Sequence, residues 1–200
     1  MRSAMKLAAL GLAALFLSGC VVRSIFPFYG SETVAATKAV PSGKWKVVQA
    51  PTRNWEKYTP WVVADDRLTT YDEDGKSGVL KMTFFNVGQT LFVDLFPEEG
   101  NVSNSFAGVV LVPTHTLCKV TSIQVNGKTQ VTFTPLSFKY LKEGLESGTI
   151  NLPVVKQKDD EYLFTATTEQ WQAFLNDARN SQAVFDPEQR FDFTVEPTAK

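Results

Sequence analysis

The sequence predicts one mainly β domain: an antiparallel meander that closes into a small barrel and carries two packed α-helices. Three observations lead to this fold class. From Trp45 onward, short apolar runs alternate with turn signals. Asn126-Gly127 separates two of these runs and is a strong hairpin signal. Two other stretches have the 3.6-residue spacing of apolar side chains that is typical of amphipathic helices.

The strands are predicted from apolar and β-branched runs bounded by turn residues. In the run 90–96, Leu91, Val93 and Leu95 share one face, which we expect to point into the barrel. The predicted strands are 44–49, 79–85, 90–96, 106–112, 115–125, 129–134, 153–157, 161–166 and 190–195.

Two helices are predicted after the hairpin. In the stretch 167–180 an apolar stripe runs from Trp171 to Ala178, and Thr167 with Gln170 forms a capping box. The stretch 136–148 is shorter, with Ser137 as the N-cap and Gly148 as the stop.

The first 19 residues have the pattern of an export signal. Basic residues at positions 2 and 6 precede an apolar run that is shorter than the ~20 residues a membrane-spanning helix needs. Small residues then lead to a cysteine in Leu17-Ser18-Gly19-Cys20. The chain therefore divides into a signal peptide (1–19), Cys20 with a tether (20–42) and one β-rich domain (43–200).

The stretch Leu17-Ser18-Gly19-Cys20 resembles the lipobox of bacterial lipoproteins. The resemblance implies that Cys20 carries diacylglycerol on its sulfur and an N-acyl chain on its new amino terminus. It also implies a location, because lipoproteins that stay in the inner membrane have Asp after the lipidated Cys, whereas this chain has Val21 and Val22. We therefore expect an anchor in the outer membrane, facing the periplasm, with no other cofactor.

The tether has four large apolar residues, Ile25, Phe26, Phe28 and Tyr29. Such side chains either lie in the membrane interface or pack on the domain, and packing on the domain is the more common arrangement.

Charge and cysteine content exclude several classes of protein. Loss of residues 1–19 removes two basic residues and no acidic ones, which leaves 18 Lys and Arg against 21 Asp and Glu, a net charge of −3. This balance does not favour nucleic-acid binding. Cys118 is the one cysteine besides Cys20, so we expect no intramolecular disulfide.

Catalytic and metal patterns are weak. His115 is the single histidine, and residues three apart on a strand face opposite ways, so His115 and Cys118 should not form a nucleophile pair. Asp72, Glu73 and Asp74 read as a solvated turn, because no Glu follows at calcium-loop spacing. The sequence predicts neither a metal site nor an enzyme, although paired carboxylates of a hydrolase have no local signature.

Gly43-Lys44-Trp45 resembles the opening motif of lipocalins and the wider calycin group, in which the Trp closes one end of a barrel. The pieces 115–120, 136–145 and 165–175 are also similar to uncharacterised bacterial lipoproteins, a resemblance that implies no activity. The chain lacks the lipocalin Thr-Asp-Tyr motif, and its last strand follows the second helix.

Three functions remain open. The first is binding of an apolar or lipid-like ligand in the barrel, and the second is an accessory role on an envelope protein partner with a filled core. The third, and the least favoured, is an envelope hydrolase that uses carboxylates. Small barrels of about 8 strands either fill with side chains or hold one small ligand. The residues expected at the barrel end or along the ligand are Trp45, Phe84, Val93, Leu95 and Phe133.

Overall fold

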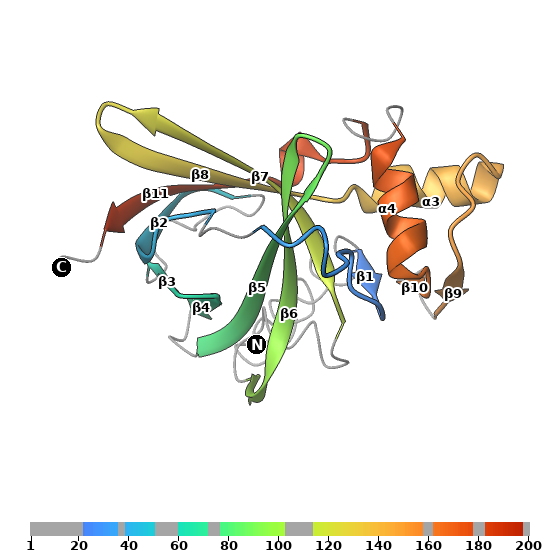
Figure 1. Ribbon diagram of the computed structural model, residues 1–200, viewed down its shortest axis with the longest axis horizontal. Coiled ribbons are helices and arrows are strands. Elements are labelled where there is room, and N and C mark those ends of the chain that lie inside the picture. The colour runs from blue at the N-terminus through green and yellow to red at the C-terminus, as the bar shows by residue number, and fades with distance from the viewer. Residues whose placement is uncertain are drawn as a thin grey trace, which may run out of the picture.

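The computed structural model of the chain describes residues 22–35, 39–50, 60–71, 77–102, 114–157, 162–177 and 183–197. Eight antiparallel strands form a closed barrel in the order β11-β2-β3-β4-β5-β6-β7-β8, which confirms the predicted fold class and agrees with a calycin-like architecture. Strands β2 to β8 follow the chain as a meander, and β11 closes the barrel between β8 and β2 (Figure 1). The barrel strands are β2 Gly43–Gln49, β3 Trp61–Ala64, β4 Arg67–Tyr71, β5 Ser77–Val87, β6 Thr90–Val102, β7 Thr116–Val125, β8 Lys128–Pro135 and β11 Phe191–Pro197.

The predicted hairpin joins β7 and β8. Val125 pairs with Lys128 across the turn, and Asn126 and Gly127 have positive φ angles of 50° and 76°. Two consecutive positive φ angles are the geometry of a type I′ turn, which matches the twist of the strands it joins.

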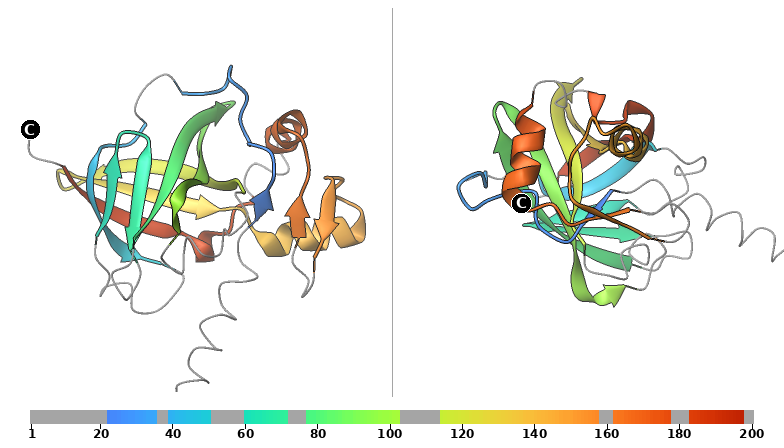
Figure 2. Two further views of the ribbon diagram at one scale, coloured as in Figure 1. Left: turned by 90° about the horizontal axis from the view of Figure 1, so that it is seen from below. Right: turned by 90° about the vertical axis from the view of Figure 1, so that its right-hand side faces the viewer.

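Between β8 and β11 the chain leaves the barrel and builds a second unit, which we call the outer lobe. It contains the helices α3 Phe138–Ser147 and α4 Thr168–Asn176 and the strands β9 Val154–Lys156 and β10 Tyr162–Phe164. A short 3₁₀ helix, η3 Pro187–Gln189, leads back to β11. Figures 1 and 2 show the helices together at one side of the barrel.

Both helices begin at the predicted caps. The Thr167 side chain accepts from the Gln170 backbone N–H while the Gln170 side chain accepts from the Thr167 N–H, so the capping box is present. Ser137 caps α3 by accepting from the Tyr140 N–H. Helix α3 ends at Gly148, whose φ of 72° is left-handed, as its prediction as a stop requires.

The strands predicted at 153–157 and 161–166 exist, but they are not part of the barrel. They are β9 and β10, which form a three-stranded sheet with β1 Arg23–Ser24 in the order β1-β10-β9. Strand β1 comes from the segment expected to be a tether. The strand predicted at 106–112 lies outside the described residues.

Residues 22–35 pack on the domain. Val22 and Phe28 are buried, and the Tyr29 ring lies 5.9 Å from that of Phe85 on β5. Ile25 and Phe26 are 40% and 43% exposed. Val22 and Phe28 belong to the core of the outer lobe, so this part of the expected tether packs on the domain.

Candidate functional site

The structure places all five predicted barrel residues in the barrel interior. Trp45 and Val93 are fully buried, Phe133 and Leu95 are 2% and 8% exposed, and Phe84 packs partly buried against the same cluster. The pairing of β5 with β6 agrees with this placement, because Phe84 lies opposite the interior residue Val93. The Trp45 indole N–H donates to the carbonyl of Pro41 at 3.1 Å, which holds the ring at its position near the start of β2.

Aromatic side chains occupy this interior and contact one another. The Phe193 ring lies 5.3 Å from Trp45, 5.4 Å from Trp61 and 5.6 Å from Phe133. Such contacts between rings in edge or tilted orientation are typical of a packed core. The described residues of this cluster fill the interior with side chains, which is one of the two arrangements that a barrel of about 8 strands allows; the other is to hold one small ligand.

The outer faces of three neighbouring barrel strands carry a second core. Phe85 on β5, Phe92 on β6 and Leu117 on β7 are buried beneath the outer lobe. Trp171 and Leu175 on α4 and Leu141 on α3 belong to the same cluster. The barrel thus supplies one wall of the outer lobe.

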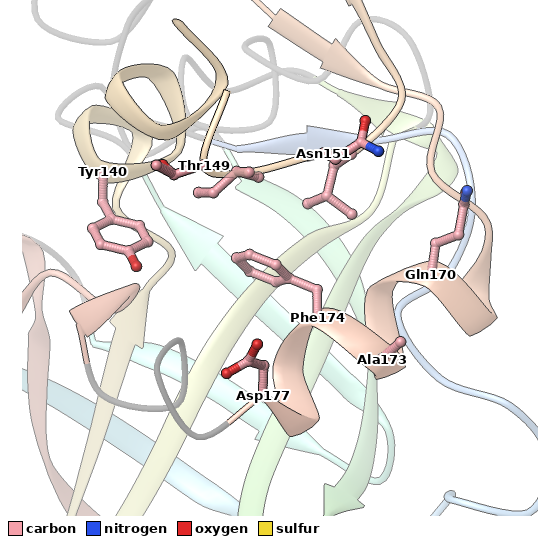
Figure 3. A pocket seen from close by; sticks show the side chains of 9 residues that line it. Tyr140, Thr149, Asn151, Gln170, Ala173, Phe174 and Asp177 are labelled. Carbon is pink, nitrogen blue, oxygen red and sulfur yellow. The ribbon is translucent and has the colours of Figure 1, made fainter. Parts of the chain in front are cut away.

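A cleft of about 410 Å³ lies within the outer lobe, between α3, α4 and the extended segment 149–152. Its size is within the usual range of ligand pockets. Figure 3 shows Phe174 reaching from α4 toward that segment, with Tyr140 of α3 at one side of the cleft. The lining residues are Tyr140, Thr149, Ile150, Asn151, Leu152, Gln170, Ala173, Phe174 and Asp177.

Local contacts hold the walls of the cleft. The Ile150 N–H donates to the Gly144 carbonyl at 3.0 Å, and a Cβ at position 144 would collide with the Ile150 side chain. The absence of a side chain on Gly144 therefore lets the segment 149–152 lie against α3. On the opposite wall, the capping box fixes Gln170 in the first turn of α4.

The chemistry of the lining is mixed. Phe174 and Tyr140 offer aromatic rings, Asn151 and Gln170 offer amides, and Asp177 offers one carboxylate. None of the described lining residues is Lys or Arg, so this part of the lining favours neutral or cationic groups over phosphates and carboxylates. The sequence did not reveal this site, because its walls come from segments that meet only through packing of the outer lobe.

A second feature missed by the sequence is a buried carboxylate. Asp94 on β6 is 1% exposed, accepts from the Phe28 backbone N–H at 3.1 Å and lies 2.8 Å from Nδ1 of His115. The backbone of His115 also pairs with Ser24 through two hydrogen bonds. Asp94 and His115 thus bind the N-terminal segment to the barrel.

This group does not provide a nucleophile. Ser24 is fully buried, and its hydroxyl donates to the Phe26 carbonyl at 2.8 Å while it accepts from the Trp171 indole N–H at 3.0 Å. These bonds hold Trp171 and the N-terminal segment in position.

Cys118 is buried in the barrel interior opposite Val93 on β6, whereas His115 contacts Asp94 on the outer side. Burial raises the pKa of the Cys118 thiol to about 12, and the charge of Asp94 adds to this effect. A thiol with this pKa is protonated at neutral pH and is a poor nucleophile or metal ligand.

Among the described residues, no cluster of three or more His, Cys, Asp or Glu side chains has a geometry suited to a metal ion. The helices in that part of the chain are all too short or too polar to span a membrane. Cys20 and Asp72–Asp74 lie outside the described residues. Comparisons of the chain with models of protein families, with curated proteins and with solved structures find no match.

Proposed function

We propose that this protein is a lipid-anchored accessory protein of the bacterial envelope, which acts by binding a protein partner and not by catalysis. Acyl chains on Cys20 hold it in the outer membrane, facing the periplasm. The barrel is the scaffold, and a segment of the partner binds in the cleft of the outer lobe.

One observation favours the accessory role over ligand binding in the barrel, the first two of the functions that the sequence leaves open. Large side chains fill the barrel, with Trp45, Phe133 and Phe193 in mutual ring contact, while the 410 Å³ cleft lies outside it. An apolar or lipid-like ligand in the barrel is therefore the less supported candidate, because it would have to displace packed rings. The cleft combines aromatic rings, amides and a carboxylate, which suits a peptide with neutral or basic side chains.

Photo-crosslinking in cells tests this proposal. Benzoylphenylalanine is incorporated in the full-length protein at Gln170, an exposed lining residue, and at Ile123, an exposed residue of β7, as the matched control. We expect a discrete protein adduct from position 170 and none from position 123. Equal adduct patterns at the two positions, or no adduct from position 170, would contradict a partner in the cleft.

The anchor is tested separately. Cys20→Ala should abolish incorporation of labelled palmitate into the full-length protein, whereas Cys118→Ala, which changes a buried thiol, should leave it unchanged. Labelling that persists in Cys20→Ala would exclude lipidation at Cys20.

A further inference from the structure

One face of the three-stranded sheet of the outer lobe is not covered by any helix or strand of the described residues. The register aligns Arg23 of β1 with Leu163 of β10 and Leu163 with Val155 of β9, so these three side chains form one row across the sheet. Val155 is 52% exposed, and Arg23 and Leu163 are half-buried. Ile25, two residues after Arg23, continues the ladder, because its N–H donates to the Phe164 carbonyl at 3.1 Å.

The helices cover only the opposite face of this sheet. Phe164 contacts Trp171 of α4 with 5.2 Å between ring centroids, and Tyr162 contacts Phe138 of α3 at 5.7 Å. Residues 162 and 164 share a face because they are two apart on a strand. Figure 1 accordingly shows β9 and β10 on one side of the two helices. Leu163 and Val155 point away from both helices.

The lipidation site lies close to this uncovered face in the chain. A single residue separates Cys20 from Val22, and Val22 is only 2% exposed. Two residues span at most about 7 Å, so a lipid on Cys20 leaves the domain beside β1. The exposed Ile25 and Phe26 follow β1 directly. A domain held this closely cannot stand far from the bilayer.

We propose that the uncovered face of this sheet, with Ile25, Phe26, Leu163 and Val155, lies in the interface of the membrane that holds the acyl chains. The inference rests on the lipidation of Cys20 in the proposed function and adds the orientation of the domain. Apolar side chains of an interfacial segment enter the boundary between headgroups and acyl chains. Arg23 at the rim keeps its charged group at headgroup level.

Other exposed apolar residues of the described chain do not form such a group. Val34 lies beside Phe85 of β5, Val48 lies on β2 and Ile123 on β7, and single exposed residues of this kind are ordinary. The uncovered sheet face is different because Val155 of β9 and Leu163 of β10 lie in one sheet with the segment of Ile25 and Phe26, which follows β1 next to the anchor. With this face on the membrane, the cleft between α3 and α4 is on the side of the sheet that faces the periplasm.

A single-cysteine fluorescence experiment tests the orientation in the full-length lipoprotein. Val155→Cys and Ile123→Cys are each labelled with an environment-sensitive nitrobenzoxadiazole dye and reconstituted into phosphatidylethanolamine–phosphatidylglycerol vesicles. Cys20 is blocked by its acyl chain, and Cys118 is buried with a raised pKa of about 12, so the introduced thiol takes the label. Position 155 is informative because it is 135 residues from Cys20 in the chain and reaches the membrane only if the sheet docks.

We expect the dye at position 155 to emit at shorter wavelength, several-fold more strongly, and to be quenched by doxyl-labelled lipids. The dye at position 123 should behave as in water. Water-like emission at position 155 in protein that carries labelled palmitate and floats with the vesicles would overturn docking and leave the anchor intact. Equal quenching at both positions would also overturn it. Failure of flotation, with no palmitate incorporated, would overturn the anchor and the docking together.

Discussion

The two cores of this molecule are built in different ways. The barrel core comes from strands that follow one another in the chain, and it is closed by antiparallel pairing of each strand with its neighbours. The core of the outer lobe joins buried residues from 22–28, from the outer faces of β5, β6 and β7, and from the stretch 136–185. Neighbouring strands enclose a filled interior, whereas distant segments leave a cleft between them. The comparison suggests that the barrel provides stability and the outer lobe provides recognition.

The largest expected effect comes from a substitution that creates a cavity in the barrel core. Phe193→Ala removes a ring that contacts four other rings, and it should lower the free energy of unfolding by about 3–5 kcal/mol. Chemical denaturation measures this loss, with Ile123→Ala as an exposed control expected to change stability by less than about 0.5 kcal/mol. A Phe193→Ala protein as stable as the control would show that the barrel interior is loosely packed.

The next prediction separates the two cores. Asp94→Ala leaves the Phe28 N–H and the His115 ring without their acceptor and should cost about 1–3 kcal/mol. Hydrogen exchange should show faster exchange at Phe28, while the amides of β2 and β11 keep their protection. Asp94→Asn retains an oxygen acceptor and should lose less stability than Asp94→Ala. If Asp94→Ala exposed the barrel amides as readily as Phe28, the two cores would be a single cooperative unit.

The third prediction concerns the stability of the barrel at alkaline pH. The Cys118 thiol has a pKa near 9.0 when solvated and about 12 in the fold, so between these values the unfolded chain loses a proton that the folded chain keeps. The contribution of this thiol to the free energy of unfolding is fully present below pH 9.0. It decreases as the pH rises toward 12, with a slope of about 1.4 kcal/mol per pH unit.

Denaturation of wild type and Cys118→Ala from pH 8 upward measures this contribution as a difference. We expect the two stability curves to converge above pH 9.0. Curves that remain parallel would mean that the thiol is accessible to solvent.

The smallest effect is expected at the cap of α4. Thr167→Ala removes the hydroxyl that accepts from the Gln170 N–H and should cost about 1 kcal/mol, with Thr167→Ser close to wild type. Faster hydrogen exchange should be confined to α4. Equally faster hydrogen exchange in β2 would argue against an outer lobe that opens independently of the barrel.

The sequence predicts the barrel well because its information is local. Alternation in the run 90–96 identifies Val93 and Leu95 as interior residues, and Asn126-Gly127 identifies the hairpin. The helix caps at Thr167 and Ser137 are also local signals, and both are present. Strands β3 and β4, with four and five residues, are not among the predicted strands.

The outer lobe is less predictable for a physical reason. Strand β1 has two residues and pairs in parallel with β10, about 140 positions later, which no local pattern can indicate. Asp94 alternates with apolar residues as a solvated side chain would, and it is buried only because the segment containing Phe28 covers it. The cleft depends in the same way on how α3 and α4 pack.

Native mass spectrometry of the full-length lipoprotein, released gently into detergent, tests most directly whether the barrel is a filled scaffold. We predict the mass of the polypeptide from Cys20 to Lys200 plus its acyl groups, with no further component. A discrete extra mass that vanishes on denaturation and extracts into organic solvent would contradict the account, because the barrel would then hold an apolar ligand.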